Sequence, residues 1–384
     1  MEIPTKQDLI ALMTEHEGPH VSLYMPTHTA GAETQEDRIH LKNLLTTAED
    51  GLVEADMRRT IAKDVLAPAE ALEDDTEFWQ HQSGGLAIFI SAAGTHRFRV
   101  PRALPELALV QPRFHLKPLL PLLSAGESFH VLAISANRTH LLACTANSQG
   151  EVKLEGMPRG IAEVLWPDDT EKQGQFHSFY AGASGATGVF HGAGSSEAQP
   201  KDELLRYFNA VDGVLAPYMR THGGPLLLAC VDYLAPIYRE ANSYAHLSEA
   251  HVGGSPDRTL DEHLRAAAWE LVRPGFESAR EEAVARYRQL AGTGQTTSDV
   301  AEAALAAVSG KIDTVFVTLG KAQWGRIDTD AYKVETHDEQ APGDYDLLDT
   351  IAAHTLVAGG TVYAVEEEAA PEPTGVAAVF RYAG

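Results

Sequence analysis

The chain has 384 residues and a formal net charge of −24. It is longer than the roughly 250–300 residues at which a single hydrophobic core stops growing, so two or three domains are expected. The acidic excess holds throughout: residues 1–125 carry 11 basic and 18 acidic side chains, residues 126–298 carry 14 and 21, and residues 299–384 carry 5 and 15. No segment has the basic excess that marks electrostatic binding of nucleic acid, which argues against a DNA-binding protein. Any contact with RNA would be local.

Several features predict a cytoplasmic protein that does not bind membranes. No apolar run reaches the roughly 18–20 residues that span a bilayer. The first residues lack the basic and apolar regions of a signal peptide. The two cysteines, Cys144 and Cys230, lie in strand-like apolar runs, which favours buried thiols in a reducing compartment.

Residues 1–125 are predicted to form an N-terminal α/β domain. Its first helix begins at the capping residues Thr5 and Asp8. An apolar stripe predicts a helix over 33–56, and a further helix follows over 57–72. Short apolar runs predict strands at 21–26, 85–91, 96–101 and 108–112. The turn around Gly94 predicts that the second and third of these strands form a hairpin.

Residues 126–298 are predicted to form a central domain. Three strands with short, turn-rich connectors predict an antiparallel meander over 128–157. An amphipathic helix follows over 201–219, and a continuous apolar run over 225–232 is typical of a strand covered on both faces. Helical sequence over 259–290 is broken or kinked at Pro274.

A long loop, residues 174–200, separates the meander from the helix. It holds six Gly, four Ser and two His in 27 residues and has neither helix nor strand periodicity. Loops longer than about 12–15 residues are uncommon inside compact domains and are usually functional or disordered. The sequence therefore predicts that this loop is used.

Residues 299–384 are predicted to form a three-layer α/β/α domain. The boundary lies at 292–299, where Thr297 or Ser298 is expected to cap a helix that ends at Gly310. Helix and strand patterns then alternate: strands are predicted at 313–319, 323–328, 361–366 and 375–382, and a helix at 345–360.

The order of these parts resembles the archaeo-eukaryotic peptide-chain release factors and Pelota. DTVFVTLG, DLLDTIAAHTLVAGGTVYAV and GVAAVFRY are similar to their last domain, which has an L30e/L7Ae-like fold. The central segment looks like their RNase H-like domain. VSLYMPTH and FHLKPLLPLL resemble the bacterial branch, in particular family three of the bacterial release-factor-like proteins. The resemblance covers most of the chain and depends on pattern and order.

This resemblance implies association with the ribosome, through its RNA and its proteins. Release factors insert a loop with Gly-Gly-Gln into the peptidyl transferase centre, and the matching loop here is 174–200. It contains Gly174 and Gln175 near its start and His191, Gly192 and Gly194 near its end. Gly-Gly-Gln occurs nowhere in the chain, because its four Gly-Gly pairs are followed by Leu, Pro, Ser and Thr. This departure argues against termination-type hydrolysis. Gln175 and His191 remain the candidates if any hydrolysis is retained.

Other chemistry finds little support in the sequence. A P-loop, a zinc motif and a GxSxG nucleophile elbow are absent from the sequence, so neither a cofactor nor a metal is expected. An RNase H-like nuclease would need clustered carboxylates, and the second segment offers four candidates, most of them at helical or strand-end positions: Asp212, Asp232, Asp261 and Glu262. At such positions solvated acids are common.

Basic and aromatic residues near the loop and the central strand leave alternatives open. Lys201 and Arg206 follow the loop and could contact RNA phosphate, or they could belong to a solvated helix face with pairs such as Glu203–Arg206. Tyr233, Tyr238, Arg239 and Tyr244 follow the strand over 225–232. A packing role is favoured for these tyrosines over ligand binding.

The leading hypothesis is a ribosome-associated protein acting in rescue, hibernation or translation quality control. It is not expected to carry out Gly-Gly-Gln-type peptidyl-tRNA hydrolysis. Two alternatives come from other classes: a non-ribosomal protein-interaction module that kept the fold, which the acidic charge favours, and a small-molecule hydrolase with its pocket under the long loop.

Overall fold

The computed structural model describes residues 4–14, 18–28, 33–123, 128–165 and 201–382. The chain divides into two compact units. The first consists of Met1–Phe129, Ala143–Gly150 and Arg265–Gly384, and the second of His130–Leu142 and Glu151–Leu264. None of the helices in the described residues is long and apolar enough to cross a membrane. The sequence predicts three domains, whereas the contacts divide the chain into two units, so the three-domain division stays a prediction.

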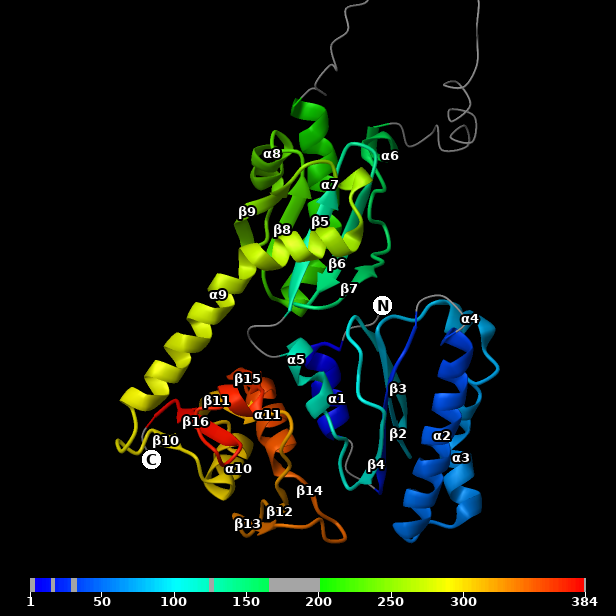
Figure 1. Cartoon of the computed structure of the whole chain (residues 1–384), viewed down its shortest axis with the longest axis vertical. Coiled ribbons are helices and arrows are strands. Elements are labelled where there is room, and N and C mark those ends of the chain that lie inside the picture. The colour runs from blue at the N-terminus through cyan, green and yellow to red at the C-terminus, as the bar shows by residue number, and fades with distance from the viewer. Residues whose placement is uncertain (1–3, 15–17, 29–32, 124–127, 166–200, 383–384) are drawn as a thin grey trace, which may run out of the picture. The chain divides into compact units, whose positions relative to one another are not determined.

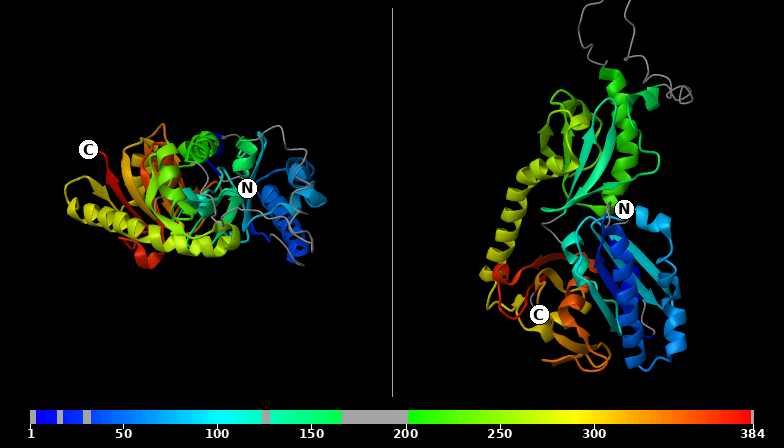
Figure 2. Two further views of the ribbon diagram at one scale, coloured as in Figure 1. Left: turned by 90° about the horizontal axis from the view of Figure 1, so that it is seen from above. Right: turned by 45° about the vertical axis from the view of Figure 1, so that its right-hand side comes forward.

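The N-terminal part is an antiparallel sheet with helices on both faces (Figures 1 and 2). Its strands, in the order β3-β2-β1-β4, are β1 (His20–Pro26), β2 (Gly85–Ser91), β3 (Gly94–Val100) and β4 (Leu107–Gln111). Its helices are α1 (Lys6–Thr14), α2 (Glu33–Glu54), α3 (Arg59–Glu70) and α4 (Thr76–Gln80). The predicted hairpin is confirmed, since β2 pairs antiparallel with β3.

Successive side chains of β1 point to opposite faces of the sheet, and both sets are buried, so the sheet has two apolar faces. Val21, Leu23 and Met25 pack with α2 and α3, whereas Tyr24 points to the other face, toward α1 and the segment after β4. That segment contains the 3₁₀ turn η1 (Lys117–Leu119) and α5 (Leu120–Leu123). The predicted cap of α1 is confirmed: the Thr5 amide donates to Asp8 Oδ2 at 2.7 Å, and the Asp8 amide donates to Thr5 Oγ1 at 3.2 Å.

The central sheet has five strands in the order β7-β6-β5-β8-β9. They are β5 (Phe129–Ile134), β6 (Thr139–Cys144), β7 (Gln149–Val152), β8 (Leu226–Cys230) and β9 (Leu247–Gly253). Four-residue connectors join β5 to β6 and β6 to β7, as in a meander, while β8 runs parallel to β5 and β9 runs parallel to β8. The helical elements of this part are α6 (Ile161–Leu165), α7 (Lys201–His222), α8 (Leu234–Ala241) and η4 (Pro256–Arg258).

The C-terminal sheet is covered on one face by two helices and on the other by the end of a third. The strands are β10 (Thr296–Thr297), β11 (Ile312–Thr318), β15 (Thr361–Val365) and β16 (Val376–Phe380), in the order β10-β16-β11-β15. The helical elements are α9 (Asp261–Gln289), α10 (Val300–Val308), α11 (Leu347–Val357) and η5 (Glu367–Ala369). Val315 and Val317 pack with α10 and α11, whereas Phe316 packs with Val284 and Tyr287 of α9. The sheet therefore has helices on both faces, but the third layer comes from α9, outside residues 299–384, so a three-layer domain formed by residues 299–384 alone stays a prediction.

Several details differ from the sequence prediction, among them strand β9, which was not predicted, and β7, which lies at 149–152 and not further along the chain. The N-cap of α10 is Asp299, whose side chain accepts from the Glu302 amide at 2.8 Å, so Thr297 and Ser298 were the wrong candidates. Helix α9 continues through Pro274, which contradicts the predicted break there and leaves the alternative of a kink as a prediction. A small sheet that the sequence did not predict in full consists of β12 (Trp324–Asp328), β13 (Lys333–His337) and β14 (Tyr345–Asp346). The predicted mixed α/β multidomain class is confirmed, while the labels RNase H-like and L30e-like stay predictions.

Candidate functional site

The loop predicted to face the ribosome is flanked by two helices that pack together. Residues 166–200 follow the last residue of α6 and precede the first residue of α7, and these helices contact one another. The loop candidates lie outside the described residues: Gly174, Gln175, His191, Gly192 and Gly194. What the structure does define is the base of the loop.

The first half of α7 is fixed to the turn between β5 and β6. Leu204, Phe208 and Val211 are buried on its inner face. The Tyr207 hydroxyl donates to the Ser135 carbonyl oxygen at 3.1 Å and shares a second hydrogen bond with the Thr139 hydroxyl. Burial raises the pKa of Tyr207 to about 12, so this hydroxyl stays protonated. The helix at the base of the loop is therefore held by both packing and buried hydrogen bonds.

The two predicted cationic residues on α7 have different surroundings. Lys201 Nζ lies 2.7 Å from Glu240 Oε2 of α8, with both side chains more than half exposed. Such exposed pairs stabilise by less than about 1 kcal/mol, so Lys201 could exchange this partner for a phosphate at little cost. Arg206 is exposed, and no ion pair with Glu203 occurs among the described residues. The geometry thus leaves both cations accessible beside the base of the loop.

The candidate nuclease carboxylates do not form one site. Asp212 is buried and accepts from the Ser243 amide and hydroxyl, at 3.1 and 2.6 Å. Asp232 lies 3.2 Å from a nitrogen of His251, and Asp261 lies 3.0 Å from a nitrogen of His140. Glu262 Oε1 lies 3.9 Å from His263 Nε2. In the described part of the chain, no three His, Cys, Asp or Glu residues come together in a group that could hold a metal ion.

The tyrosines after β8 divide into two kinds. Tyr238 is fully buried, and Tyr244 is buried with its hydroxyl donating to the Gly224 carbonyl at 2.7 Å. The predicted packing role is confirmed for these two. Tyr233 is 53% exposed, so a packing role is wrong for this residue. Arg239 is half-buried and donates a hydrogen bond to the Glu249 carbonyl oxygen.

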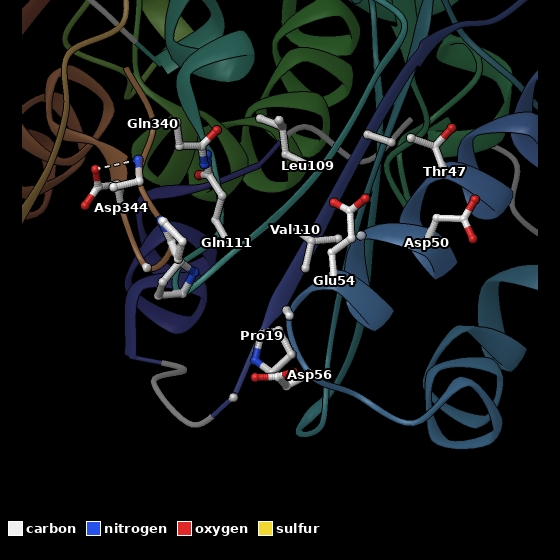
Figure 3. A pocket seen from close by; sticks show the side chains of 18 residues that line it. Pro19, Thr47, Asp50, Glu54, Asp56, Leu109, Val110, Gln111, Gln340 and Asp344 are labelled. Carbon is white, nitrogen blue, oxygen red and sulfur yellow. Dashed lines mark hydrogen bonds between the residues drawn. The ribbon is translucent and has the colours of Figure 1, made fainter. Parts of the chain in front are cut away.

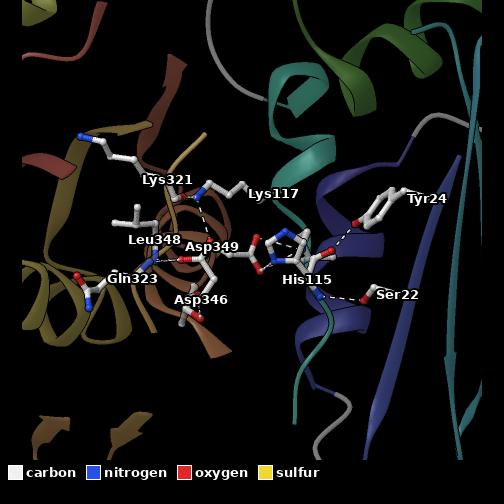
Figure 4. Close-up of polar contacts among 11 residues, drawn as sticks. Ser22, Tyr24, His115, Lys117, Lys321, Gln323, Asp346, Leu348 and Asp349 are labelled. Carbon is white, nitrogen blue, oxygen red and sulfur yellow. Dashed lines mark hydrogen bonds and ion pairs between the residues drawn. The ribbon is translucent and has the colours of Figure 1, made fainter. Parts of the chain in front are cut away.

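A polar cluster that sequence reasoning missed lies where the segment after β4 meets α11 (Figure 4). We call it the junction cluster, and its members are His115, Lys117, Asp346 and Asp349. Lys117 Nζ lies 3.0 Å from Asp346 Oδ2, and it also donates to the Lys321 carbonyl oxygen. Asp346 Oδ1 accepts from the Leu348 amide at 3.0 Å and so caps α11. All four side chains are buried.

Burial sets the protonation states in the junction cluster. Burial and the neighbouring Asp346 carboxylate raise the pKa of Asp349 to about 8, although its oxygens accept from the Leu116 amide at 3.0 Å. Burial lowers the pKa of His115 to about 4. At neutral pH, Asp349 is therefore mostly protonated and His115 neutral, which leaves Lys117 and Asp346 as the charged pair.

The junction cluster has perturbed pKa values without room for a substrate. The cavity beside it, lined by Leu116, Asp349 and His354 among others, has a volume of about 20 Å³. This is about the space of one water molecule. His115 is fixed at its backbone, where its amide donates to Ser22 Oγ at 3.0 Å and its carbonyl accepts from the Tyr24 hydroxyl. We interpret the cluster as structural. Sequence contained one signal, a lysine inside the apolar FHLKPLLPLL segment, but gave no partner for it.

Comparison with known proteins gives one family match. Residues 129–274 match the model of bacterial archaeo-eukaryotic release factor family 7. This stretch begins with β5, includes the rest of the central sheet and α7, and ends within α9. No curated protein matches the chain.

The solved structures are only distantly similar to this chain. An archaeal translation termination factor, aRF1, is 13% identical and covers 99% of both chains, with a TM-score of 0.26. A ribosome-bound archaeal Pelota with ABCE1 is 11% identical over 100% of this chain and 96% of that chain, with a TM-score of 0.36. Dom34 of S. cerevisiae, a translation termination-like factor, is 11% identical over 75% and 73%, with a TM-score of 0.35. These likenesses are too weak to support an argument about function. The part of the chain that contains the central sheet is thus similar to bacterial archaeo-eukaryotic release factor family 7, which supports the predicted superfamily but does not confirm family three.

Proposed function

We propose that this chain is a cytoplasmic, release-factor-like protein that associates with the ribosome and acts in rescue, hibernation or translation quality control. The observation that carries the proposal is the match of residues 129–274 to a release-factor family model. The base of the long loop, at α6 and α7, lies in this region, with Lys201 and Arg206 on the helix that follows the loop.

We further propose that binding, rather than peptidyl-tRNA hydrolysis, is the role of the loop over 174–200. The chain has Gly174-Gln175 but no Gly-Gly-Gln, so the backbone arrangement that positions the attacking water in release factors is not encoded. Purified protein added to a stalled peptidyl-tRNA complex should release no more peptide than the Gln175→Ala and His191→Ala variants do. Release by the native chain that either variant abolishes would contradict this part of the proposal.

Ribosome association is tested by co-sedimentation with purified 70S particles and with lysates of growing and stressed cells. We expect the protein in the ribosomal fraction in at least one of these conditions. If it is absent from that fraction with lysates from both cell states and also fails to bind purified particles, the proposal is wrong.

A matched pair of variants tests whether the base of the loop takes part. Lys201→Gln with Arg206→Gln removes two cations near the loop, and Arg220→Gln removes an exposed cation from the opposite end of α7. We expect only the first variant to sediment less with ribosomes and to show a weaker dependence on salt, because phosphate contacts release counterions. Equal behaviour of both variants would exclude a phosphate-binding role for this part of α7.

A second candidate function is a protein-interaction module that does not bind ribosomes. The observation that favours it is the net charge of −24, because an acidic surface repels ribosomal RNA. This function is supported if the chain stays out of the ribosomal fractions and co-purifies with a defined protein partner.

A further inference from the structure

A groove with an acidic side lies on the first unit, between the end of α2, strand β4 and the segment 340–344 (Figure 3). Its volume is about 890 Å³, within the range of roughly 300–1,000 Å³ that is usual for ligand sites. Its acidic lining residues on the α2 side are Asp50, Glu54 and Asp56. We propose that this groove binds a basic segment of a partner polypeptide.

A close approach of α2 to β4 forms the floor of the groove. A Cβ at Gly51 would lie 2.8 Å from Val110 Cγ2, so any larger residue would force a shift where the helix crosses the strand. Val110 also packs against the core beneath α2 and α3. Leu109 and Pro19 add apolar lining, which suits the aliphatic part of a lysine or arginine side chain.

The acidic side carries negative charge that the described residues leave only partly neutralised. Asp50 and Glu54 are four residues apart and share one face of α2, where like charges destabilise a helix. The last turn of α2 has no basic residue, although the C-terminus of a helix favours cations. Arg59 pairs with Glu49 and Asp50, at 2.8 and 2.9 Å. No ion pair of Glu54 or Asp56 occurs among the residues that the structure describes.

On the opposite side of the groove the Asp344 carboxylate already has partners, although its Oδ1 accepts no hydrogen bond from the described residues. Asp344 is buried, lies 2.7 Å from His337 Nδ1 and 3.3 Å from Arg326 Nε, and accepts from the Ala341 amide at 2.9 Å. Figure 3 shows Asp344 and Gln340 on the side away from Asp50. A cation entering the groove would therefore be drawn to Glu54 and Asp56.

A buried amide indicates that the ligand also carries hydrogen-bond acceptors. Gln111 lines the groove from β4 and is only 4% exposed, and its Nε2 has no hydrogen-bond partner among the described residues. A buried donor without an acceptor is unfavourable. A polypeptide supplies a carbonyl oxygen at each residue together with its basic side chains, whereas a polyamine supplies only donors. The acidic side chains together with the unpaired Gln111 amide therefore favour a basic peptide over a polyamine. This argument does not depend on ribosome binding.

Binding of a short, end-blocked, fluorescein-labelled peptide of alternating arginine and glycine tests the proposal by fluorescence anisotropy with the full chain. A peptide with citrulline in place of arginine keeps the shape and loses the charge. We expect saturable binding of the arginine peptide and at least tenfold weaker binding of the citrulline peptide. Lack of saturable binding of the arginine peptide would overturn the proposal.

Matched variants distinguish binding in the groove from non-specific attraction to the acidic surface of the chain. Glu54→Gln with Asp56→Asn should weaken binding by roughly tenfold, which corresponds to about 1.4 kcal/mol. Asparagine is chosen because Asp56 has a φ of 66°, which asparagine tolerates. Asp64→Asn with Glu70→Gln removes two exposed charges from α3 and should leave binding unchanged. If both pairs of substitutions weaken binding equally, the attraction is non-specific and the proposal that the peptide binds in the groove is wrong.

The Gln111→Leu variant tests whether the ligand is a peptide or a polyamine. We expect this variant to bind the arginine peptide more weakly and to bind spermidine as the native chain does. Tight spermidine binding without peptide binding would overturn the choice of ligand. If Gln111→Leu fails to fold, the Glu54 and Asp56 variants, whose side chains are exposed, still decide the question.

Discussion

The ammonium group of Lys117 lies 3.0 Å from the carboxylate of Asp346, a residue 229 positions later in the chain, and the two side chains are only 5% and 1% exposed. The pair fixes the segment after β4 to the first turn of α11. Asp346 also caps α11, so the same carboxylate pairs with Lys117 and accepts a hydrogen bond from the first turn of the helix.

Lys117→Met should destabilise the protein strongly. It leaves the Asp346 charge buried without its cation, which typically costs about 3–5 kcal/mol. The free energy of unfolding in urea measures this cost. Lys321→Met is the matched control, because Lys321 Nζ lies 2.7 Å from Glu367 with side chains 32% and 67% exposed. The control should lose less than about 1 kcal/mol. Similar losses in both variants would contradict a special role of the buried pair.

The junction cluster should make stability fall as the pH rises from 6.5 to 8. The pKa of Asp349 is raised to about 8, so in this window the folded state holds a proton that the unfolded chain has lost. The slope contributed by this group is at most about 1.4 kcal/mol per pH unit. Asp349→Asn should flatten the pH profile of the unfolding free energy between pH 6.5 and 8. An unchanged difference between native chain and variant across this range would contradict the raised pKa.

At lower pH, His115 should affect the pH dependence of stability in the direction opposite to Asp349. Its pKa is lowered to about 4, so between pH 4 and 6.5 the unfolded chain binds a proton that the folded state does not. This contribution to stability is lost as the pH falls and opposes the contribution of Asp349 there. In His115→Gln, unfolding measurements from pH 4 to 6.5 should show a steeper rise of stability toward low pH than in the native chain. Parallel profiles would argue against the lowered pKa.

Asp299→Ala should remove the N-cap of α10. The Glu302 amide would lose its acceptor at 2.8 Å, at a cost of about 1 kcal/mol. Ser298→Ala changes the neighbouring residue, whose hydroxyl does not cap the helix, and should cost less than about 0.5 kcal/mol. Thermal unfolding of both variants measures the difference, and a larger loss for Ser298→Ala would reverse the assignment of the cap.

Gly325→Ala should disturb the small sheet of β12, β13 and β14. A Cβ at Gly325 would lie 2.0 Å from the Glu335 carbonyl oxygen and 2.9 Å from Leu347 Cδ1, so the strands must move apart. Overpacking of this kind typically costs about 1–3 kcal/mol. Gly320→Ala is the control, because no atom lies within 4 Å of its added Cβ. Equal stability of the two variants in urea would show that the strands yield without cost.

Local sequence patterns determined most of the elements of this protein. Apolar runs and alternation predicted β1, β2, β8 and β11, since each buries side chains of a continuous hydrophobic segment. The capping pair Thr5 and Asp8 was also predicted, because its hydrogen bonds join residues three apart. Strand β13 was not predicted, because its five residues are exposed or half-buried and carry no apolar run.

Tertiary structure decided which distant residues meet. Lys117, Asp346 and Asp349 look like ordinary charged residues in the sequence, and only folding buries them together and so shifts the pKa of Asp349. The same holds for the groove, where Gln111 and Glu54 come from separate elements. Local pattern and order were enough to predict most of the elements and the resemblance to release factors. The junction cluster and the groove depend on long-range packing, which periodicity does not encode.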